Sequence, residues 1–168
     1  GMVAVSLGEG FSQIFKDLSV DHIVEGGQTM NPSIEDILEA VESIRAKTVF
    51  VLPNNSNVIL AATQAAELSK KNVVVIPTKN VAMGIGAVVA FQPDMSPEDN
   101  AEVMTEAANR VKTGQITFAV RDSSFEDKEI KEGDIIGIYN GKIQVVGNDV
   151  HQVAVELMQV LVTDEDEL

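Results

Sequence analysis

The chain contains no cysteine and no tryptophan, and aromatic residues make up 4% of its 168 residues. Without cysteine, disulfide bonds and thiol catalysis are excluded. Because aromatic side chains are scarce, the core must be built from Val, Ile, Leu, Ala and Met. The lack of cysteine fits a reducing compartment, and we expect a cytoplasmic protein.

Basic residues are also scarce, since 12 Lys and Arg oppose 26 Asp and Glu and give a formal net charge of −14. This charge argues against an unaided nucleic-acid binder, because phosphates would be repelled over most of the surface. It suggests instead that partners present basic faces. The acidic run at residues 164–168 is interpreted as a solvated tail.

Long apolar runs are missing as well. The longest runs, such as Val81 to Phe91, are too short to cross a bilayer and are broken by glycines, so we expect no membrane span. Nothing resembles a signal peptide. Gly1 before Met2 is typical of a residue left by a purification tag, and we therefore expect a piece of a longer protein.

Four short apolar runs alternate with polar loops and helical patterns in the first part of the chain. The runs are Val3–Leu7, Asp21–Val24, Thr48–Leu52 and Asn72–Ile76. Strands that are apolar throughout are covered on both faces, which predicts a parallel sheet between two layers of helices. The expected fold class is α/β, a three-layer α/β/α arrangement with a mainly parallel sheet of about four strands.

The alternation of apolar runs and helical patterns ends after Phe91. Ser96 and Pro97 predict the start of a helix that runs to about Val111. The following section is predicted to be antiparallel. It has a strand at 115–121 with one solvent-exposed face, then two strands joined by an Asn-Gly turn at 140–141. A closing helix is expected from residue 149. We assign residues 2–91 to the parallel layer and 92–163 to a helix, antiparallel strands and closing helix of the same domain.

The chain is organised around the polar glycine loop at residues 25–33, between a predicted strand and a predicted helix. Two helix starts are open. Asn31 can cap a helix that has Pro32 at its first position, or Ser33 and Asp36 can form a capping box one turn along. In either case, backbone amides, an amide side chain and a hydroxyl gather at a helix N-terminus, where carboxylates and phosphates can bind.

Three other polar loops would lie at the same edge, because the carboxyl ends of parallel strands meet there and ligands bind where the strand order reverses. Lys79 is the one cation in these loops and could neutralise a bound anion. Alternatively, the residues of each loop only permit a tight turn or cap a helix, without binding a ligand. The candidate ligand- or partner-binding residues are Ser6, Glu9, Glu25, Gly26, Gly27, Gln28, Thr29, Asn31, Ser33, Asn54, Asn55, Thr78 and Lys79.

No catalytic or metal-binding residue is assigned. The glycines at 8 and 10 lack the third glycine of a dinucleotide fingerprint, and nothing matches a P-loop. His22 and His151 fall in separate elements with no second histidine nearby, so no metal site is expected. The hydroxyls of Ser6, Ser56 and Thr78 have no neighbouring base in the sequence that would make a nucleophile.

Four motifs in order resemble the C-terminal half of bacterial dihydroxyacetone-kinase-like proteins, a family also labelled DAK phosphatase and associated with the ATP-binding subunit of fatty acid kinase. The motifs are EGGQTMNPS at 25–33, LPNN at 52–55, VIPTK at 75–79 and KTGQITFAVRD at 112–122. The resemblance covers essentially the whole chain.

The resemblance implies an N-terminal kinase domain that binds ATP and magnesium, a middle domain, and a C-terminal region related to DegV-type fatty-acid carriers. The present chain looks like that last region. It has no counterpart of the magnesium-binding aspartates, so no cofactor is expected in it. Family members usually continue with a further α/β segment, so the chain is expected to end early. In DegV-like carriers a loop of the Thr-Ser-Gln-Pro-Ser type holds the fatty-acid carboxylate, and residues 28–33 are similar to it.

Three functions are therefore considered. The first is a non-catalytic module that helps the kinase subunit engage its fatty-acid-carrying, DegV-like partner during acyl phosphate formation. The second is a small-molecule or lipid binder that holds a carboxylate or phosphate with Gln28, Thr29, Ser33 and Asn54. The third is a phosphatase or glycerone-kinase type enzyme, as the older family label implies. A homodimer is also possible.

Overall fold

The structure is a computed structural model that describes residues 1–27, 30–125 and 128–162. Two compact units are present, Gly1–Val111 and Lys112–Leu168. Each unit is described by itself. In the three described ranges, no helix combines the length and the apolarity that a bilayer crossing requires.

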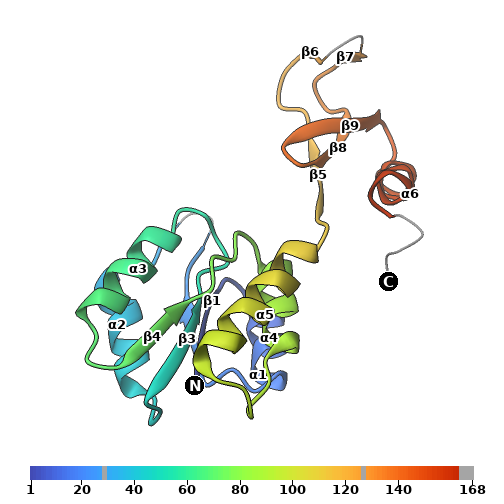
Figure 1. The fold of residues 1–168 in the computed structure, drawn as a ribbon. Helices are drawn as coiled ribbons and strands as arrows, with labels where there is room; N and C mark the ends of the chain where they lie inside the picture. The colour runs from blue at the N-terminus through green and yellow to red at the C-terminus, as the bar shows by residue number, and fades with distance from the viewer. Residues whose placement is uncertain (28–29, 126–127, 163–168) are drawn as a thin grey trace. The chain divides into compact units, whose positions relative to one another are not determined.

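The first unit is built on a four-stranded parallel sheet (Figure 1). Its strands are β1 (Met2–Ser6), β2 (His22–Glu25), β3 (Thr48–Leu52) and β4 (Asn72–Val75). They lie side by side in the order β2-β1-β3-β4, and all three pairings are parallel. The chain therefore leaves β1 toward one edge of the sheet and β3 toward the other, so the strand order reverses between β1 and β3. The predicted parallel sheet of about four strands is confirmed.

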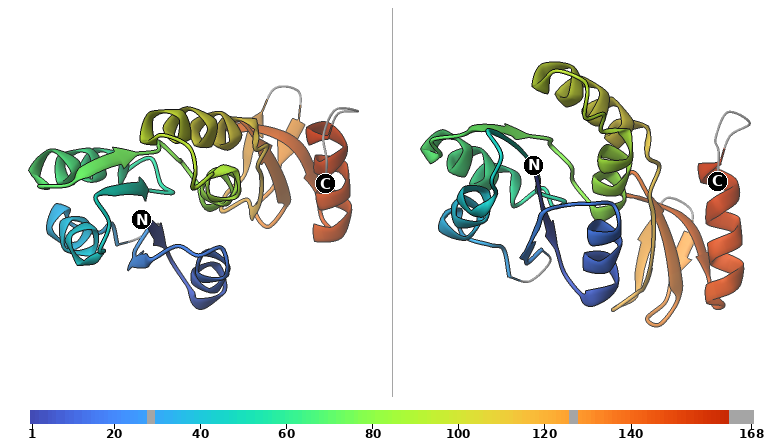
Figure 2. Two further views of the ribbon diagram at one scale, coloured as in Figure 1. Left: turned by 60° about the horizontal axis from the view of Figure 1, so that its bottom comes forward. Right: turned by 90° about the horizontal axis from the view of Figure 1, so that it is seen from below.

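Five helices cover the two faces of this sheet. They are α1 (Glu9–Asp17), α2 (Ile34–Ser43), α3 (Ile59–Leu68), α4 (Val81–Ala90) and α5 (Pro97–Arg110). Helices α2 and α3 lie on one face, whereas α1, α4 and α5 lie on the other (Figures 1 and 2). Ser96 caps α5 by accepting a hydrogen bond from the Asp99 amide, and Pro97 occupies the first turn, as predicted.

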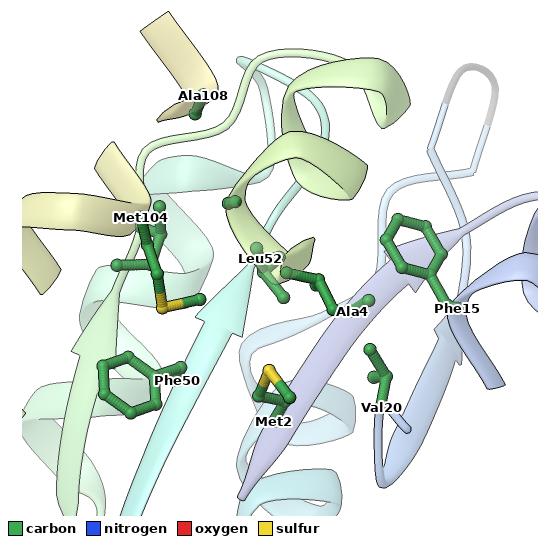
Figure 3. Close-up of a cluster of buried hydrophobic side chains, with 11 residues drawn as sticks. Met2, Ala4, Phe15, Val20, Phe50, Leu52, Met104 and Ala108 are labelled. Atoms are coloured by element: carbon green, nitrogen blue, oxygen red, sulfur yellow. The ribbon is translucent and has the colours of Figure 1, made fainter. Parts of the chain in front are cut away.

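The alternation of side chains along each strand produces two aliphatic cores, one on each side of the sheet. Val3 and Val5 of β1 join the cluster under α2 and α3, while Met2 and Ala4 join the cluster under α1, α4 and α5. Figure 3 shows the second cluster, where Met104 of α5 lies close to Phe50 of β3. Phe15 and Phe50 thus lie in a core that is otherwise aliphatic.

The second unit has a three-stranded antiparallel sheet and one helix. Its elements are β5 (Gly114–Phe118), β6 (Ser123–Phe125), β7 (Lys128–Ile130), β8 (Ile135–Tyr139), β9 (Lys142–Gly147) and α6 (Val150–Leu161). The sheet order is β5-β8-β9. Asn140 and Gly141 connect β8 to β9 with φ angles of 50° and 73°, the left-handed pair that a tight hairpin turn requires. Asp149 caps α6, as expected.

The structure differs from the sequence analysis in where it divides the chain. The pattern changes at Phe91, but the next helix, α5, packs against α4 and sends Met104 and Ala108 into the first core. The compact units separate between Val111 and Lys112. A change of sequence pattern therefore does not mark the point where packing contacts stop.

Two features of the second unit are not indicated by the sequence pattern. The pairing of β6 with β7 lies in a polar, charged stretch whose three-residue strands show no apolar alternation. Strand β5 was expected to have one wet face, yet all five of its residues are exposed, including Ile116 and Phe118. Strand β5 lies at the edge of its sheet, with β8 as its neighbour among the residues that the structure describes.

Candidate functional site

Buried polar side chains are concentrated at the carboxyl edge of the parallel sheet. Those among the described residues are Ser6, Asn54, Thr78 and Asn100. The first three follow or end β1, β3 and β4 at this edge, whereas Asn100 belongs to α5 and closes the turn at Gln92. Because a buried polar group is costly unless it is hydrogen-bonded, the partners of these side chains define what the edge is built to do.

Asn54 links β1 to the loops that follow β3 and β4. Its side-chain Nδ2 donates to the Val5 carbonyl of β1 at 2.9 Å, and its backbone N–H donates to Thr78 Oγ1 at 3.0 Å. The Thr78 hydroxyl donates in return to Asn54 Oδ1 at 2.8 Å. The backbone at Asn54 has a φ of 54°, a left-handed conformation that asparagine tolerates better than most residues.

Helix α4 lies directly over the Asn54 side chain. A Cβ atom added at Gly84 would be 2.1 Å from Asn54 Oδ1, so only glycine allows the helix to approach this closely. The start of α4 is fixed by Asn80, whose side chain accepts a hydrogen bond from the Met83 amide at 2.9 Å. The amide network and the helix above it therefore fill the space where the strand order reverses.

Asn55 extends the network to the loop after β2. Its Nδ2 donates to the Gly27 carbonyl at 2.6 Å, and its Oδ1 accepts from the Asn57 amide at 2.9 Å. In the same loop, Gly26 donates its N–H to the Ser6 carbonyl at 3.0 Å. A Cβ atom at Gly26 would be 2.8 Å from the Met30 carbonyl oxygen, which explains the glycine. Hydrogen bonds thus join the end of β1 and the loops that follow β2, β3 and β4.

The start of α2 resolves the two alternatives of the sequence analysis in favour of the capping box. Ser33 is the N-cap, and its hydroxyl accepts from the Asp36 amide at 3.1 Å. The Asp36 carboxylate accepts from the Ser33 hydroxyl at 2.7 Å and from its backbone N–H at 2.8 Å. The hydrogen bond from the Ser33 side chain, followed by that from its backbone, lowers the pKa of Asp36 below its usual 3.8.

The remaining candidates fall into two groups. The exposed side chains at this edge are Glu9, Glu25, Asn31 and Lys79. Gln28 and Thr29 lie outside the described residues. The structure therefore brings Ser6, Gly26, Gly27, Asn54, Asn55 and Thr78 together at the edge, with the exposed charges around them.

Two features at this edge were missed by the sequence analysis. Ser6 is 1% exposed, and its Oγ has no hydrogen-bond partner among the residues that the structure describes. Leu7, Phe11 and Ile14 are 45%, 49% and 40% exposed. Phe15 alone is buried in α1, so helical spacing indicates the apolar side of this helix but not its exposure. Across the described ranges, no group of three His, Asp or Glu residues is placed to hold a metal ion.

Comparison with known protein families identifies a family for this chain. The model of the C-terminal region of A-like subunits of fatty acid kinase matches residues 1–168. "Protein YloV" of Bacillus subtilis is 46% identical over 168 residues, and "Uncharacterized protein SAR1202" of Staphylococcus aureus is 39% identical over 167 residues. These matches cover 100% and 99% of this chain but 30% of each relative, so the chain spans about a third of the length of these proteins.

Among solved structures, the following one is similar to part of this chain. It is the phosphotransferase system component EIIA from Streptococcus agalactiae, which is 16% identical with a TM-score of 0.43. The match covers 64% of this chain and 91% of that protein.

Proposed function

Because the chain belongs to the family formed by the C-terminal regions of fatty acid kinase A-like subunits, we propose that it is a docking module that engages the fatty-acid-carrying partner of the kinase subunit. In this proposal the chain contributes no chemical step, and ATP and magnesium bind to a kinase domain outside it. The observation that carries the proposal is the bracing of the carboxyl-edge loops by Asn54, Asn55 and Thr78.

The bracing supports docking because it uses the polar groups of the edge internally. Asn54 and Thr78 are buried and bonded to each other and to Val5. Their role is to hold neighbouring loops in a fixed arrangement. A surface that is already ordered loses little conformational entropy when a partner binds, which favours association.

Exposed apolar residues next to these loops supply candidate anchors. Leu7 lies in the loop after β1, and Phe11 and Ile14 are one turn apart on α1. Met30, in the loop after β2, is 77% exposed. Large apolar side chains near one another on a surface are typical of interaction sites, and a few of them usually carry most of the binding energy.

Charge supports a basic partner. The net charge is −14, and Glu9 and Glu25 are exposed beside the apolar residues. Complementary charge speeds encounter and orients the partner more than it raises affinity. We therefore expect the association rate to fall as ionic strength rises.

The test is a titration of this chain against the lipid-loaded carrier subunit, followed by analytical ultracentrifugation. Phe11→Ser should weaken the complex about tenfold or more, as expected for a central apolar anchor. The matched control is Leu68→Ser, because Leu68 is 66% exposed but ends α3 at the opposite edge of the sheet. No complex at high concentration, or equal weakening by both substitutions, would contradict the proposal.

A further inference from the structure

Strand β2 lies at one edge of the parallel sheet, with β1 as its neighbouring strand among the residues that the structure describes. Gly26, directly after β2, donates its N–H to the Ser6 carbonyl of β1. Because backbone groups alternate in direction along a strand, the N–H of Val24 also points toward β1, whereas those of Ile23 and Glu25 point away from it. An open strand edge of this kind is a template for pairing with another strand.

Two clefts flank this edge, one on each side of the sheet. The cleft between α1 and β2 has a volume of about 810 Å³, and the cleft between α2 and β2 has a volume of about 480 Å³. Val24 belongs to the core cluster under α2 and α3, while Ile23 packs against the cluster on the opposite face. A strand added beside β2 would therefore direct alternate side chains into the two clefts.

Carboxylates dominate the lining of both clefts. They belong to Glu9, Glu25, Asp36 and Glu39, whereas Lys16 supplies a positive charge on the α1 side. The hydrogen bonds from the side chain and the backbone of Ser33 lower the pKa of Asp36, so this carboxylate is charged at neutral pH. Complementary charge favours an occupant that carries Lys or Arg. A second copy of this chain would instead bring carboxylates against carboxylates.

We propose that β2 binds an extended, basic segment of a partner protein, which adds to the four-stranded sheet as a further strand. Backbone hydrogen bonds to Ile23 and Glu25 hold the segment, and its basic side chains lie beside the carboxylates of the clefts. This inference goes beyond the docking function, because it uses a strand edge and not the apolar residues beside the carboxyl-edge loops.

The experiment uses the ¹⁵N-labelled chain and the synthetic peptide acetyl-Lys-Val-Lys-Val-Lys-Val-Lys-amide. Its alternation places the charges on one face and apolar side chains on the other. The peptide should cause saturable shifts of the β2 signals and slow the hydrogen exchange of the Ile23 and Glu25 amides. The Val24 amide, which already points toward β1, should change little. Added salt should weaken the binding, because the charges are exposed to solvent.

Two control peptides separate strand pairing from charge attraction. The same peptide with all its backbone amides N-methylated keeps its charges but has no N–H to donate, so it should bind about tenfold more weakly or not at all. A peptide with Glu in place of each Lys keeps the backbone donors and should not bind. Strand β5 provides a control within the chain, since it is an exposed edge strand without charged residues, and its amides should not change.

A charge reversal locates the site on the chain. Glu39→Lys changes an exposed residue in the lining of the α2 cleft and should weaken peptide binding about fivefold. Glu67→Lys makes the same change of net charge at an exposed position of α3, outside the described linings of both clefts. This control should leave peptide binding unchanged.

Four outcomes would overturn the proposal. They are the absence of saturable shifts in β2, equal binding of the N-methylated peptide, equal weakening by Glu39→Lys and Glu67→Lys, or protection of Ile23 and Glu25 that rises with chain concentration alone. The last outcome would identify a second copy as the occupant. The peptide titration contains no carrier subunit, so its result is independent of the docking test. Phe11→Ser, which should weaken the carrier complex, should leave peptide binding in place.

Discussion

The two compact units bury their apolar residues in different ways. In Gly1–Val111 every strand lies between two layers of helices, and an aliphatic cluster fills each side of the sheet. In Lys112–Leu168 one helix, α6, packs on one side of a three-stranded sheet, and the cluster has five buried members. The difference shows why a polar network can be buried at one edge of the first unit, where helices close over the strand ends.

The glycines of the two units also differ in what they pack against. In the second unit, Gly114, Gly137 and Gly147 lie against the Leu157 or Val153 side chains of α6, so they let a helix approach a sheet. In the first unit, Gly84 lets α4 approach the Asn54 amide. The first kind of contact stabilises a small core, while the second kind holds loops in place. We therefore expect substitutions in the second unit to change stability alone, and substitutions at the loops of the first unit to change docking as well.

The largest effect is expected for Phe15→Ala in the first core. Phe15 is fully buried, and its loss should lower the free energy of unfolding of this unit by about 3–5 kcal/mol. Urea unfolding and hydrogen exchange would measure the change. Amides in α6 should keep their protection; if they lost it in parallel, the two units would be one cooperative structure.

Leu157→Ala tests the second unit in the same way. Leu157 is 4% exposed and contacts the sheet at Gly114 and Gly137, so its truncation should cost about 2–4 kcal/mol. Because this core is small, we expect loss of protection in β5, β8 and β9 with β1–β4 unchanged. Val155, which is 45% exposed on the same helix, provides the control Val155→Ala.

Asn54→Ala should cost about 2–3 kcal/mol, because the Val5 carbonyl and Thr78 lose a buried partner. Asn72→Ala is the control, since the Asn72 side chain is exposed and its bond to Thr48 is long at 3.3 Å. Docking to the carrier subunit should weaken for Asn54→Ala beyond the loss of folded protein. Unchanged docking by fully folded Asn54→Ala protein would show that bracing is unnecessary.

The smallest expected effect is a pH dependence of the folding stability that arises at the start of α2. The pKa of Asp36 is lowered in the folded chain by the Ser33 side chain and backbone, so its ionised form stabilises the fold. That stabilisation is present above the unfolded value of about 3.8 and is lost as the pH falls through the lowered value. Asp36→Asn should therefore be less stable than the unmodified chain at pH 7, and the difference should shrink at pH 3.

Urea unfolding at several pH values would measure this difference. Glu35→Gln removes a neighbouring exposed carboxylate that makes no capping bond to Ser33, and it serves as the control. A difference for Asp36→Asn that stays constant between pH 7 and pH 3 would contradict the assigned cause.

Sequence patterns predicted the first unit better than the second for physical reasons. Strands buried on both faces give continuous apolar runs, such as Thr48–Leu52, which are hard to misread. The hairpin at Asn140 was also found, because its turn demands particular residues. Edge strand β5 and the short strands β6 and β7 depend on pairing partners, which local periodicity does not reveal.

The candidate site was predicted in position but not in detail. The meeting of loops at the carboxyl edge follows from parallel topology alone. Asn54 is bonded internally, while the Ser6 hydroxyl has no partner among the residues that the structure describes. This difference depends on distances between strands, and no spacing in the sequence encodes them. The expected DegV-like partner, the absence of cofactors in this chain and the older enzyme labels stay predictions.

Hydrogen exchange of the chain, alone and with the lipid-loaded carrier subunit, tests the docking account most directly. We predict added protection at Leu7, Phe11 and the neighbouring loop amides of the carboxyl edge in the first unit, with little change in α6 and its sheet. Protection confined to residues 112–162, with the carboxyl edge unchanged, would contradict the account and move the docking surface to the second unit.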